Sequence, residues 1–390
     1  MEIDRKALLD TLTLAFRAVD RKATIGPTAE VRFSGGHAPC LEATDGRIGL
    51  ILPLVAGLGA QDAPGMIRRI VLDVLRLAPG DTVDVAGLPP ERFGAGNGVR
   101  IAAGAYEAEL IGSAVADFPD LPYGGEAVAT FDVPALRSAF KVAVGVASRD
   151  ETRPNLQAIH VECRDGAARL VATDGHRLYE SAPCGAAAAG ASSLLVRAPA
   201  LRLALDVAAH YGADRIDLSR APDGSAVFAA GDGVAVGSPT EAGYAFPDWR
   251  PPVAAALRTM QATVTADRDA WICAVRRSAS HAGGAKRARA DLRLTVGPSG
   301  ARVGIDDVDA GAGSAGVEAA DVRGEAEMTF TPTYVLAAFA GCAPGAVDVG
   351  VADSGALRIT DLAGAWQIVM ARNHEAVKRA AEPKAEREAA

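Results

Sequence analysis

The chain has 390 residues, 49% of them hydrophobic, and a formal net charge of −8. This length exceeds one ordinary hydrophobic core, and the acidic balance argues against a simple basic nucleic-acid-binding protein. No uncharged apolar run of about 18 residues and no signal-peptide pattern are present, so a soluble cytoplasmic protein is expected. The cysteines form no CxxC pair, which favours buried small hydrophobic residues over disulfides or metal ligands. They are Cys40, Cys163, Cys184, Cys273 and Cys342.

From the N-terminus onward, the chain repeats itself with an offset of 128 residues. The offset carries Phe118-Pro119-Asp120 onto Phe246-Pro247-Asp248, and Arg21 onto Arg149. Both copies also have apolar positions spaced as one face of an α-helix. These are Leu8, Leu12, Ala15, Phe16 and Val19, then Leu136, Phe140, Ala143, Val144 and Ala147. A looser third copy starts at Ala262-Thr263-Val264-Thr265 and has Trp271, Val275 and Ala279 on one helix face.

Each copy also contains a second helix that leads into a strand, and short alternating stretches with Gly-rich turns indicate antiparallel strands. The phrase Glu42–Arg47 recurs at Val171–Arg177. The prediction is an α+β chain of three repeated domains, each with two helices packed on antiparallel sheets. The domains are expected at 1–124, 125–254 and 255–374, and the charged segment 375–390 is expected to be a disordered tail.

Positive charge is concentrated in the predicted helices. Helices over 5–22, 66–76, 134–149, 197–209, 268–289 and 333–341 would together carry +14, leaving −22 for the rest of the chain. A basic wall backed by an acidic one suits a protein that contacts DNA phosphates without reading sequence. The other interpretation is an ordinary solvated helix face. The predicted DNA-binding residues are Arg21, Lys22, Arg68, Arg69, Arg137, Lys141, Arg149, Arg197, Arg202, Arg276 and Arg277.

Two segments, Ser148–Leu156 and Leu170–Leu178, closely resemble the bacterial DNA polymerase III β sliding clamp family. The string Ala172–Leu178 in the second repeat is quite specific, and Phe-Pro-Asp at the end of two repeats supports the resemblance. It covers residues 1–374. It implies a head-to-tail homodimer whose six domains close a ring around double-stranded DNA, with helices lining the hole and no metal or cofactor.

The resemblance also implies a pocket that takes short peptide motifs of partners such as DNA polymerase III and the clamp loader. The matching residues here are Arg153, Leu156, Val171, Thr173, Gly175, His176, Arg177, Leu178, Pro247, Tyr334, Ile368 and Met370. Leu156, Val171 and Leu178 could equally be strand core.

The chain departs from the family pattern at four places. Met370–His374 replaces a Met-Pro-Met-Arg-Leu-like end, and Thr24–Pro27 replaces a Leu-Pro-Ile-Leu-like segment. Ser280-His281 stands where an apolar pair is usual at the dimer contact, and Pro251-Pro252 replaces a basic stretch. These differences raise the alternative of a divergent clamp-like scaffold with other partners, or one that no longer encircles DNA.

Catalysis is a weaker alternative. Asp174 and His176 would share a face on a strand, but neither a nucleophile elbow nor a metal-ligand motif accompanies them. Gly231-Asp232-Gly233 does not open a helix and is predicted to be a turn rather than a dinucleotide-binding loop. A non-catalytic protein is therefore expected.

Overall fold

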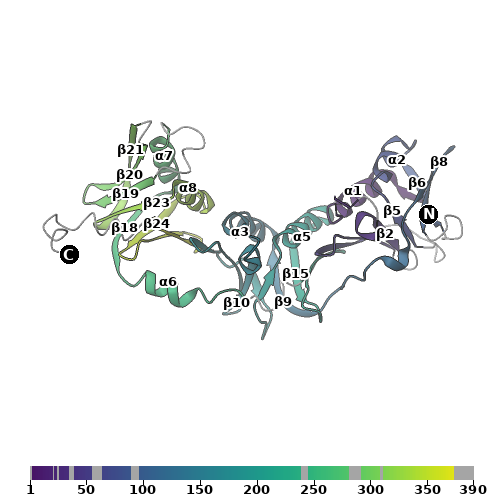
Figure 1. The fold of residues 1–390 in the computed structure, drawn as a ribbon, viewed down its shortest axis with the longest axis horizontal. Coiled ribbons are helices and arrows are strands. Elements are labelled where there is room, and N and C mark those ends of the chain that lie inside the picture. The colour runs from purple at the N-terminus through teal and green to yellow at the C-terminus, as the bar shows by residue number, and fades with distance from the viewer. Residues whose placement is uncertain are drawn as a thin grey trace. The chain divides into compact units, whose positions relative to one another are not determined.

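The computed structural model describes residues 2–372 except 21, 24–25, 35–38, 55–63, 89–95, 239–244, 281–290 and 308–310. The chain divides into two compact units. Unit 1 contains Met1–Arg137, His160–Ala168 and Cys184–Tyr244, and unit 2 contains Ser138–Ile159, Arg169–Pro183 and Ala245–Ala390. Three elements contribute residues to both units: α3 (Val133–Val146), β10 (Ile159–Arg164) and β11 (Ala167–Thr173). Figure 1 labels the elements.

Unit 1 contains two antiparallel sheets. One has the order β1-β6-β7-β8, and the other runs β5-β2-β3-β4-β17-β16-β15-β9-β13 through successive pairings. The strands are β1 (Glu2–Asp4), β2 (Val31–Ser34), β3 (Cys40–Thr44), β4 (Ile48–Pro53), β5 (Gly65–Ile67), β6 (Thr82–Leu88), β7 (Gly98–Ala103), β8 (Tyr106–Ile111), β9 (Glu126–Asp132), β13 (Gly185–Ala187), β14 (Leu194–Val196), β15 (Arg215–Arg220), β16 (Ala226–Ala230) and β17 (Gly233–Gly237). The helices are α1 (Arg5–Ala15), α2 (Val71–Leu77), α5 (Ala198–Tyr211) and the short η1 (Pro27–Ala29) and η3 (Val115–Asp117).

Unit 2 likewise has antiparallel sheets. One runs β11-β12-β26-β25-β24-β18-β22, and the other has the order β21-β20-β19-β23. The strands are β12 (Arg177–Glu180), β18 (Met260–Asp267), β19 (Asp291–Gly297), β20 (Gly300–Asp307), β21 (Gly311–Val317), β22 (Ala319–Gly324), β23 (Ala326–Phe330), β24 (Ala346–Ala352), β25 (Ala356–Asp361) and β26 (Trp366–Met370). The helices are α4 (Pro154–Gln157), α6 (Arg250–Ala256), α7 (Arg268–Ser278) and α8 (Pro332–Gly341).

The first helix of each predicted repeat starts in the same way. A strand ends at an aspartate whose carboxylate accepts hydrogen bonds from the next backbone N–H groups, which satisfies donors that a helix N-terminus leaves free. Asp4 accepts from Ala7 N at 2.7 Å, Asp132 accepts from Ala135 N at 2.9 Å, and Asp267 accepts from two amides at 2.8 and 3.1 Å. The same short side chain therefore fixes the strand-to-helix entry three times along the chain.

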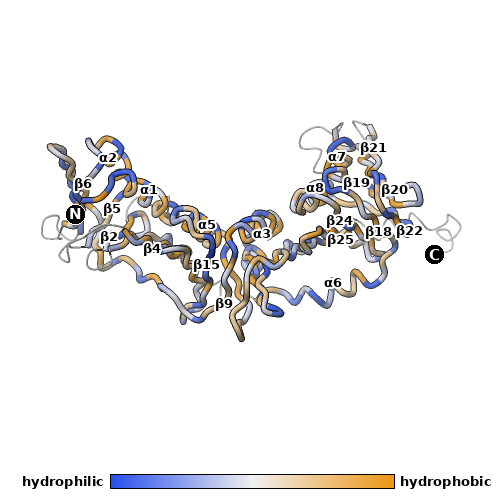
Figure 2. The backbone as a smooth tube through the Cα atoms, turned by 180° about the vertical axis from the view of Figure 1, so that it is seen from behind, coloured by the Kyte–Doolittle hydropathy of each residue, from blue (hydrophilic) through white to orange (hydrophobic). Residues whose placement is uncertain are grey.

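The apolar helix faces predicted from the sequence are largely buried. Leu8, Leu12 and Trp271 are at most 3% exposed, and Trp271 stacks on Phe339 with ring centroids 5.0 Å apart. Val144 is only partly buried. Buried and exposed positions alternate along β15, β18 and β19, as expected for strands that cover a core on one face. Figure 2 shows hydrophobic and hydrophilic stretches in both units. In unit 2, α7 and α8 lie on one side of the sheet that contains β18 and β24, and α6 lies on the other (Figure 1).

Several helices are shorter than predicted, so they carry less positive charge than the sequence assigned to them. α1 ends at Ala15 rather than at residue 22, and α7 ends at Ser278, while 281–290 lie outside the described residues. Residues 65–67 form β5, so α2 begins only at Val71. Counted within the observed bounds, the six predicted helices carry +5 instead of +14. Residues that favour a helix continue in the sequence beyond the points where the hydrogen-bonded helices α1 and α7 end.

Other predictions had mixed outcomes. All five cysteines are free thiols, but Cys273 is exposed and Cys163 is only half-buried, so the expectation of uniform burial was wrong. Gly231-Asp232-Gly233 does form the turn between β16 and β17. The domain limits at 124, 254 and 374 remain a prediction, and the predicted tail lies outside the described residues. No helix among the described residues is long and apolar enough to span a membrane.

Candidate functional site

Unit 2 contains an apolar groove with a volume of about 300 Å³. One side is formed by the end of β11, the turn into β12, and β26, and the other side by α6 and the segment before it. The lining residues are Leu156, Thr173, Gly175, His176, Arg177, Leu178, Pro247, Asp248, Trp249, Pro252, Val253, Ala256, Ile368 and Met370. A concave, mostly apolar surface with a few polar groups at its rim is typical of a binding site.

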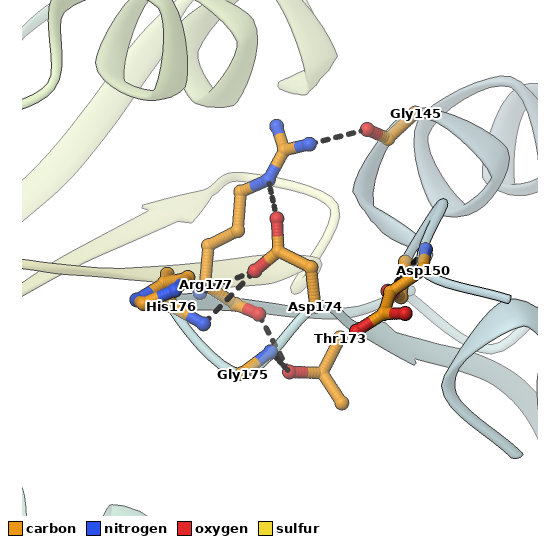
Figure 3. A network of polar contacts seen from close by, with 8 residues as sticks. Gly145, Asp150, Thr173, Asp174, Gly175, His176 and Arg177 are labelled. Carbon is orange, nitrogen blue, oxygen red and sulfur yellow. Dashed lines mark hydrogen bonds and ion pairs between the residues drawn. The ribbon is translucent and has the colours of Figure 1, made fainter. Parts of the chain in front are cut away.

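The turn between β11 and β12 is held by its own side chains (Figure 3). Thr173 Oγ1 donates to the Arg177 carbonyl at 2.7 Å and accepts from Gly175 N at 3.1 Å. Asp174 Oδ1 accepts from the amides of His176 and Arg177 at 2.9 and 3.0 Å. Gly175 has φ of +92°, a region that favours glycine. The repeated Thr-Asp-Gly phrase is thus a turn-forming sequence that presents His176 at the groove.

The same turn occurs in unit 1 with nearly the same distances. Thr44 Oγ1 donates to the Ile48 carbonyl at 2.7 Å, and Asp45 Oδ1 accepts from two amides at 2.8 Å. After each turn the next strand pairs with the last strand of the following repeat. β4 pairs with β17, and β12 pairs with β26. The backbone bond from Ser238 N to the Arg47 carbonyl matches the bond from Met370 N to the His176 carbonyl, at 2.9 and 3.0 Å.

The Arg177 side chain holds the β11–β12 turn, which lines the groove, in place. Its Nε donates to Asp174 Oδ2 at 2.9 Å and an Nη donates to the Gly145 carbonyl at 2.6 Å, near the end of α3 (Figure 3). Its guanidinium lies over the Tyr334 ring, 4.4 Å from the centroid. The side chain is only 15% exposed. The guanidinium is thus committed within the protein, and its role is to fix the turn against α3 and α8.

The wall formed by α6 was not predicted from the sequence. Val253, Ala256 and Leu257 pack against the buried Ala352, Ala356 and Ile368, and Ser354 Oγ donates to the Ala256 carbonyl at 2.6 Å. Small alanines on both sides allow this close approach.

Just before the helix, Trp249 packs with Val171 and Leu178, and its ring centroid lies 5.5 Å from that of Trp366. Arg250 lies over the other side of Trp249, at 4.3 Å. Pro251-Pro252, noted only as a departure from a family pattern, was the available signal, because proline is favoured in the first turn of a helix.

Nine of the twelve predicted groove residues line it. These are Leu156, Thr173, Gly175, His176, Arg177, Leu178, Pro247, Ile368 and Met370. Val171 is fully buried beneath the groove among Leu178 and Trp249. Tyr334 lines a neighbouring cavity, and a guanidinium nitrogen of Arg153 lies 3.6 Å from the point that a Cβ on Gly175 would occupy.

That neighbouring cavity is polar and has a volume of about 510 Å³. It is lined by Ala147, Ser148, Arg149, Asp174, His176, Arg177, Thr333 and Tyr334. His176 and Arg177 therefore line both cavities, which meet at the β11–β12 turn. Next to it, hydrogen bonds from the Thr152 hydroxyl and amide lower the pKa of Asp150.

Several predicted DNA-binding residues have partners within the protein. Arg68 forms an ion pair with the buried Glu30 at 3.0 Å, and Arg69 lies over the Phe16 ring at 5.8 Å. Arg137 donates to the Leu205 carbonyl at 3.3 Å. Arg197 is the N-cap residue of α5 and donates to the Ser238 carbonyl at 3.1 Å. These contacts give each side chain a structural role as well.

The remaining predicted DNA-binding residues are mostly exposed. Lys141 lies on α3, Arg202 on α5, and Arg276 and Arg277 in the last turn of α7. Lys22 and Arg149 lie outside helices, and Arg21 lies outside the described residues. Their contact with DNA stays a prediction, and the sequence placed Lys22 and Arg149 on helices that end before them.

The catalytic interpretation of Asp174 and His176 does not fit the geometry. Both residues lie in a turn rather than on a strand, and the Asp174 carboxylate is occupied by two amides and Arg177. Among the described residues no group of three or more His, Cys, Asp or Glu side chains could hold a metal ion.

No protein-family model matches the sequence. A β sliding clamp of Synechococcus elongatus is 25% identical over 333 residues, covering 83% of this chain and 85% of that protein. The sequence is therefore similar to a β sliding clamp over most of both chains, as the resemblance predicted. The fold agrees with solved clamps. The DNA polymerase III subunit β of Pseudomonas aeruginosa is 19% identical with a TM-score of 0.80, over 96% of this chain and 99% of that one.

A sliding clamp of Bartonella birtlesii, solved bound to griselimycin, is 19% identical with a TM-score of 0.78, again over 96% and 99% of the two chains. The clamp fold is therefore retained at low sequence identity, and the predicted α+β class with antiparallel sheets is confirmed. The Thr173–Arg177 turn and the α6 wall with its two tryptophans rest on this chain's own contacts.

Proposed function

We propose that this protein is a non-catalytic DNA sliding clamp of the cytoplasm, two copies of which close head to tail into a ring around duplex DNA. The observation that carries the proposal is the pairing rule of the repeats. The strand after the Thr-Asp-Gly turn of one repeat pairs with the last strand of the next, as β4 with β17 and β12 with β26. A third pair of equivalent strands remains.

The third pair consists of β21, at one edge of its sheet, and β8, at the edge of another. An open edge presents a row of unpaired N–H and C=O groups and is a template for another strand. Pairing β21 of one copy with β8 of the next would extend the rule between molecules. Because the two edges differ, such contacts are head-to-tail. They form a closed ring if the rotation that relates one copy to the next returns to the first copy.

The helices follow the same rule. Within unit 1, Arg17 of the segment after α1 forms an ion pair with Asp206 of α5 at 2.6 Å. Within unit 2, Val142 of α3 lies against Gly341 of α8. The remaining equivalents are α7 and α2. On α2 and its N-cap position, Leu77 is 79% exposed and Ile70 is 58% exposed, so apolar surface is available for a second copy of the chain.

Contact with DNA would come from exposed basic side chains on the helices. Replacing Arg137 and Lys141 by glutamate is expected to weaken association with DNA. Phosphate contacts depend on salt, so the slope of log affinity against log salt should fall by about 2 for two lost contacts. A titration over salt concentrations measures it. Since Arg137 also donates to Leu205, circular dichroism must show that the fold is kept.

The matched control replaces Arg302 and Arg323 by glutamate. These side chains are exposed on the strands β20 and β22 rather than on a helix, and the change in net charge is the same. Equal weakening by both double variants would mean that net charge alone attracts DNA, and the assignment of Arg137 and Lys141 would be wrong.

The apolar groove is proposed to take short peptide motifs of partners, including DNA polymerase III and the clamp loader. Burial of each apolar anchor contributes about 1.5–3 kcal/mol, so micromolar binding near −8 kcal/mol needs several anchors. The groove supports this because both of its walls supply large apolar surfaces, Leu178 and Ile368 on one side and Trp249 on the other.

Retention on circular DNA tests the whole proposal. The protein should stay on nicked circular DNA and leave the same DNA once it is linearised, because only a closed ring is held by topology. Native mass spectrometry should show a dimer. Equal loss from both DNAs, with a monomeric mass, would instead support a clamp-like scaffold that no longer encircles DNA.

A further inference from the structure

The apolar groove and the polar cavity adjoin each other at the β11–β12 turn, because both are lined by His176 and Arg177. The groove end is lined by Leu156, Leu178 and Ile368, whereas the cavity end has Arg149 and hydroxyl groups of Ser148 and Thr333. A ligand long enough to pass the turn would therefore meet apolar surface first and polar surface next.

The charges at the polar end are unequal. Asp174 and Arg177 neutralise each other at 2.9 Å, and the Arg177 guanidinium is also held by Gly145 and Tyr334. Arg149 is exposed, and no hydrogen bond or ion pair of its side chain is found within the described part of the chain. The nearby Asp150 is already engaged by Thr152 and lies 3.6 Å from Arg153. Arg149 thus leaves the cavity with a surplus positive charge.

We propose that the polar cavity binds an acidic side chain of the same partner peptide whose apolar anchors occupy the groove. Arg149 would supply the charge for a carboxylate, and the hydroxyl groups would supply hydrogen-bond donors. Arg177, which is already bound to Asp174, Gly145 and Tyr334, acts as a positioning residue that holds the groove and the polar cavity in place beside each other. The inference rests on the proposed peptide-binding function and narrows it to peptides that combine apolar anchors with a flanking acid.

A phosphate of DNA is the other anion that Arg149 could meet. The lining favours the peptide, because the cavity shares His176 and Arg177 with the apolar groove. Arg149 itself lies beyond the end of α3, in a segment that leads directly to Leu156 of the groove.

Paired peptides test this proposal by fluorescence anisotropy. One is an acetylated, amidated octapeptide with leucine, leucine and phenylalanine anchors in its centre and a glutamate at each end, and its twin carries glutamines instead. The unaltered protein should bind the glutamate peptide about threefold to fivefold more tightly, as expected for an exposed ion pair. The difference should shrink at high salt.

Arg149→Gln should remove the preference, and Arg149→Glu should reverse it, with the affinity for the glutamine peptide unchanged in both. The matched control is Arg323→Glu, since Arg323 is 80% exposed and lines neither cavity. This control should keep the preference.

The outcomes distinguish failure of the acidic-partner inference from failure of the proposed peptide-binding groove. Binding of both peptides with equal affinity would overturn the acidic-partner inference and leave the groove proposal standing. Binding of neither peptide would overturn the groove itself and the inference with it. If Arg149→Glu kept the glutamate preference but weakened DNA association, the cavity would serve phosphate, and the inference would be wrong.

Discussion

If two copies close into the proposed ring, Glu109→Pro is expected to weaken the dimer and to shorten its retention on circular DNA. Amides alternate in direction along a strand, and Gly112 N donates to the Asn97 carbonyl of the β7 side. The Glu109 amide, three positions earlier, therefore points to the free edge of β8. Proline there removes an edge donor without breaking the pairing with β7, a position where sheets tolerate proline.

The lost donor would leave a carbonyl of the neighbouring copy unsatisfied, at a cost of about 1–3 kcal/mol. The dimer should therefore dissociate about 10- to 100-fold more readily. Analytical ultracentrifugation and retention on nicked circles measure the two effects. Glu109→Ala is the control, because it removes the same side chain but keeps the amide. Unimpaired retention by the proline variant would show that β8 takes no part in ring closure.

Glu42→Gln is expected to destabilise unit 1 by about 3–5 kcal/mol, the usual cost of breaking a buried ion pair. Glu42 is 1% exposed and accepts two hydrogen bonds from Arg32, at 2.7 and 2.8 Å, and one from Ser34 at 2.8 Å. The segment after β8 is tied to this cluster. Tyr123 donates to Glu42 at 3.2 Å, and Arg32 lies 4.6 Å over the Phe118 ring.

The effect should depend on pH in a defined direction. Burial acts to raise the pKa of Glu42, but the hydrogen bonds from Arg32 and Ser34 outweigh it and lower the pKa below 4.5. A lowered folded-state pKa gives stability that is present above the unfolded value and is lost as pH falls through the folded value. The difference between the native protein and the Gln variant should therefore shrink in acid.

Urea unfolding followed at pH 7 and in acid measures this difference, and hydrogen exchange shows whether the loss is local to β2, β3 and the Phe118–Tyr123 segment. Glu107→Gln is the matched control. Glu107 is 55% exposed and pairs with Arg100 at 3.6 Å, so a change of at most about 1 kcal/mol is expected. An equally small effect at Glu42 would mean that the buried network contributes little.

Much of the fold could be predicted because its signals are local. The apolar helix faces depend on spacings of a few residues, and the 128-residue offset repeats those local patterns along the chain. Helix ends were the weak point. Capping and turns ended α1 and α7, although favourable residues continued beyond Ala15 and Ser278.

The site was predictable where a turn sequence fixes it and not where packing does. Thr173, Gly175 and His176, which the family resemblance assigned to a pocket, line the groove. The wall formed by α6 depends on Trp249 meeting Trp366, more than a hundred residues later, and no spacing reveals such a contact. The hydrogen bond from Arg177 to the Gly145 carbonyl could not be predicted either. From the sequence alone, a basic residue near a pocket is taken for a ligand contact.

The proposed pairing of two different sheet edges, β8 and β21, has a consequence for mixtures of subunits. A molecule with an impaired β8 edge still carries an intact β21 edge, so it could join a normal subunit on one side only. Such a pair would have one β8–β21 contact formed and the other impaired. Co-expression of the Glu109→Pro chain with the unaltered one should therefore reduce fully closed rings more steeply than the share of unaltered chain, because random pairing leaves such rings in proportion to the square of that share.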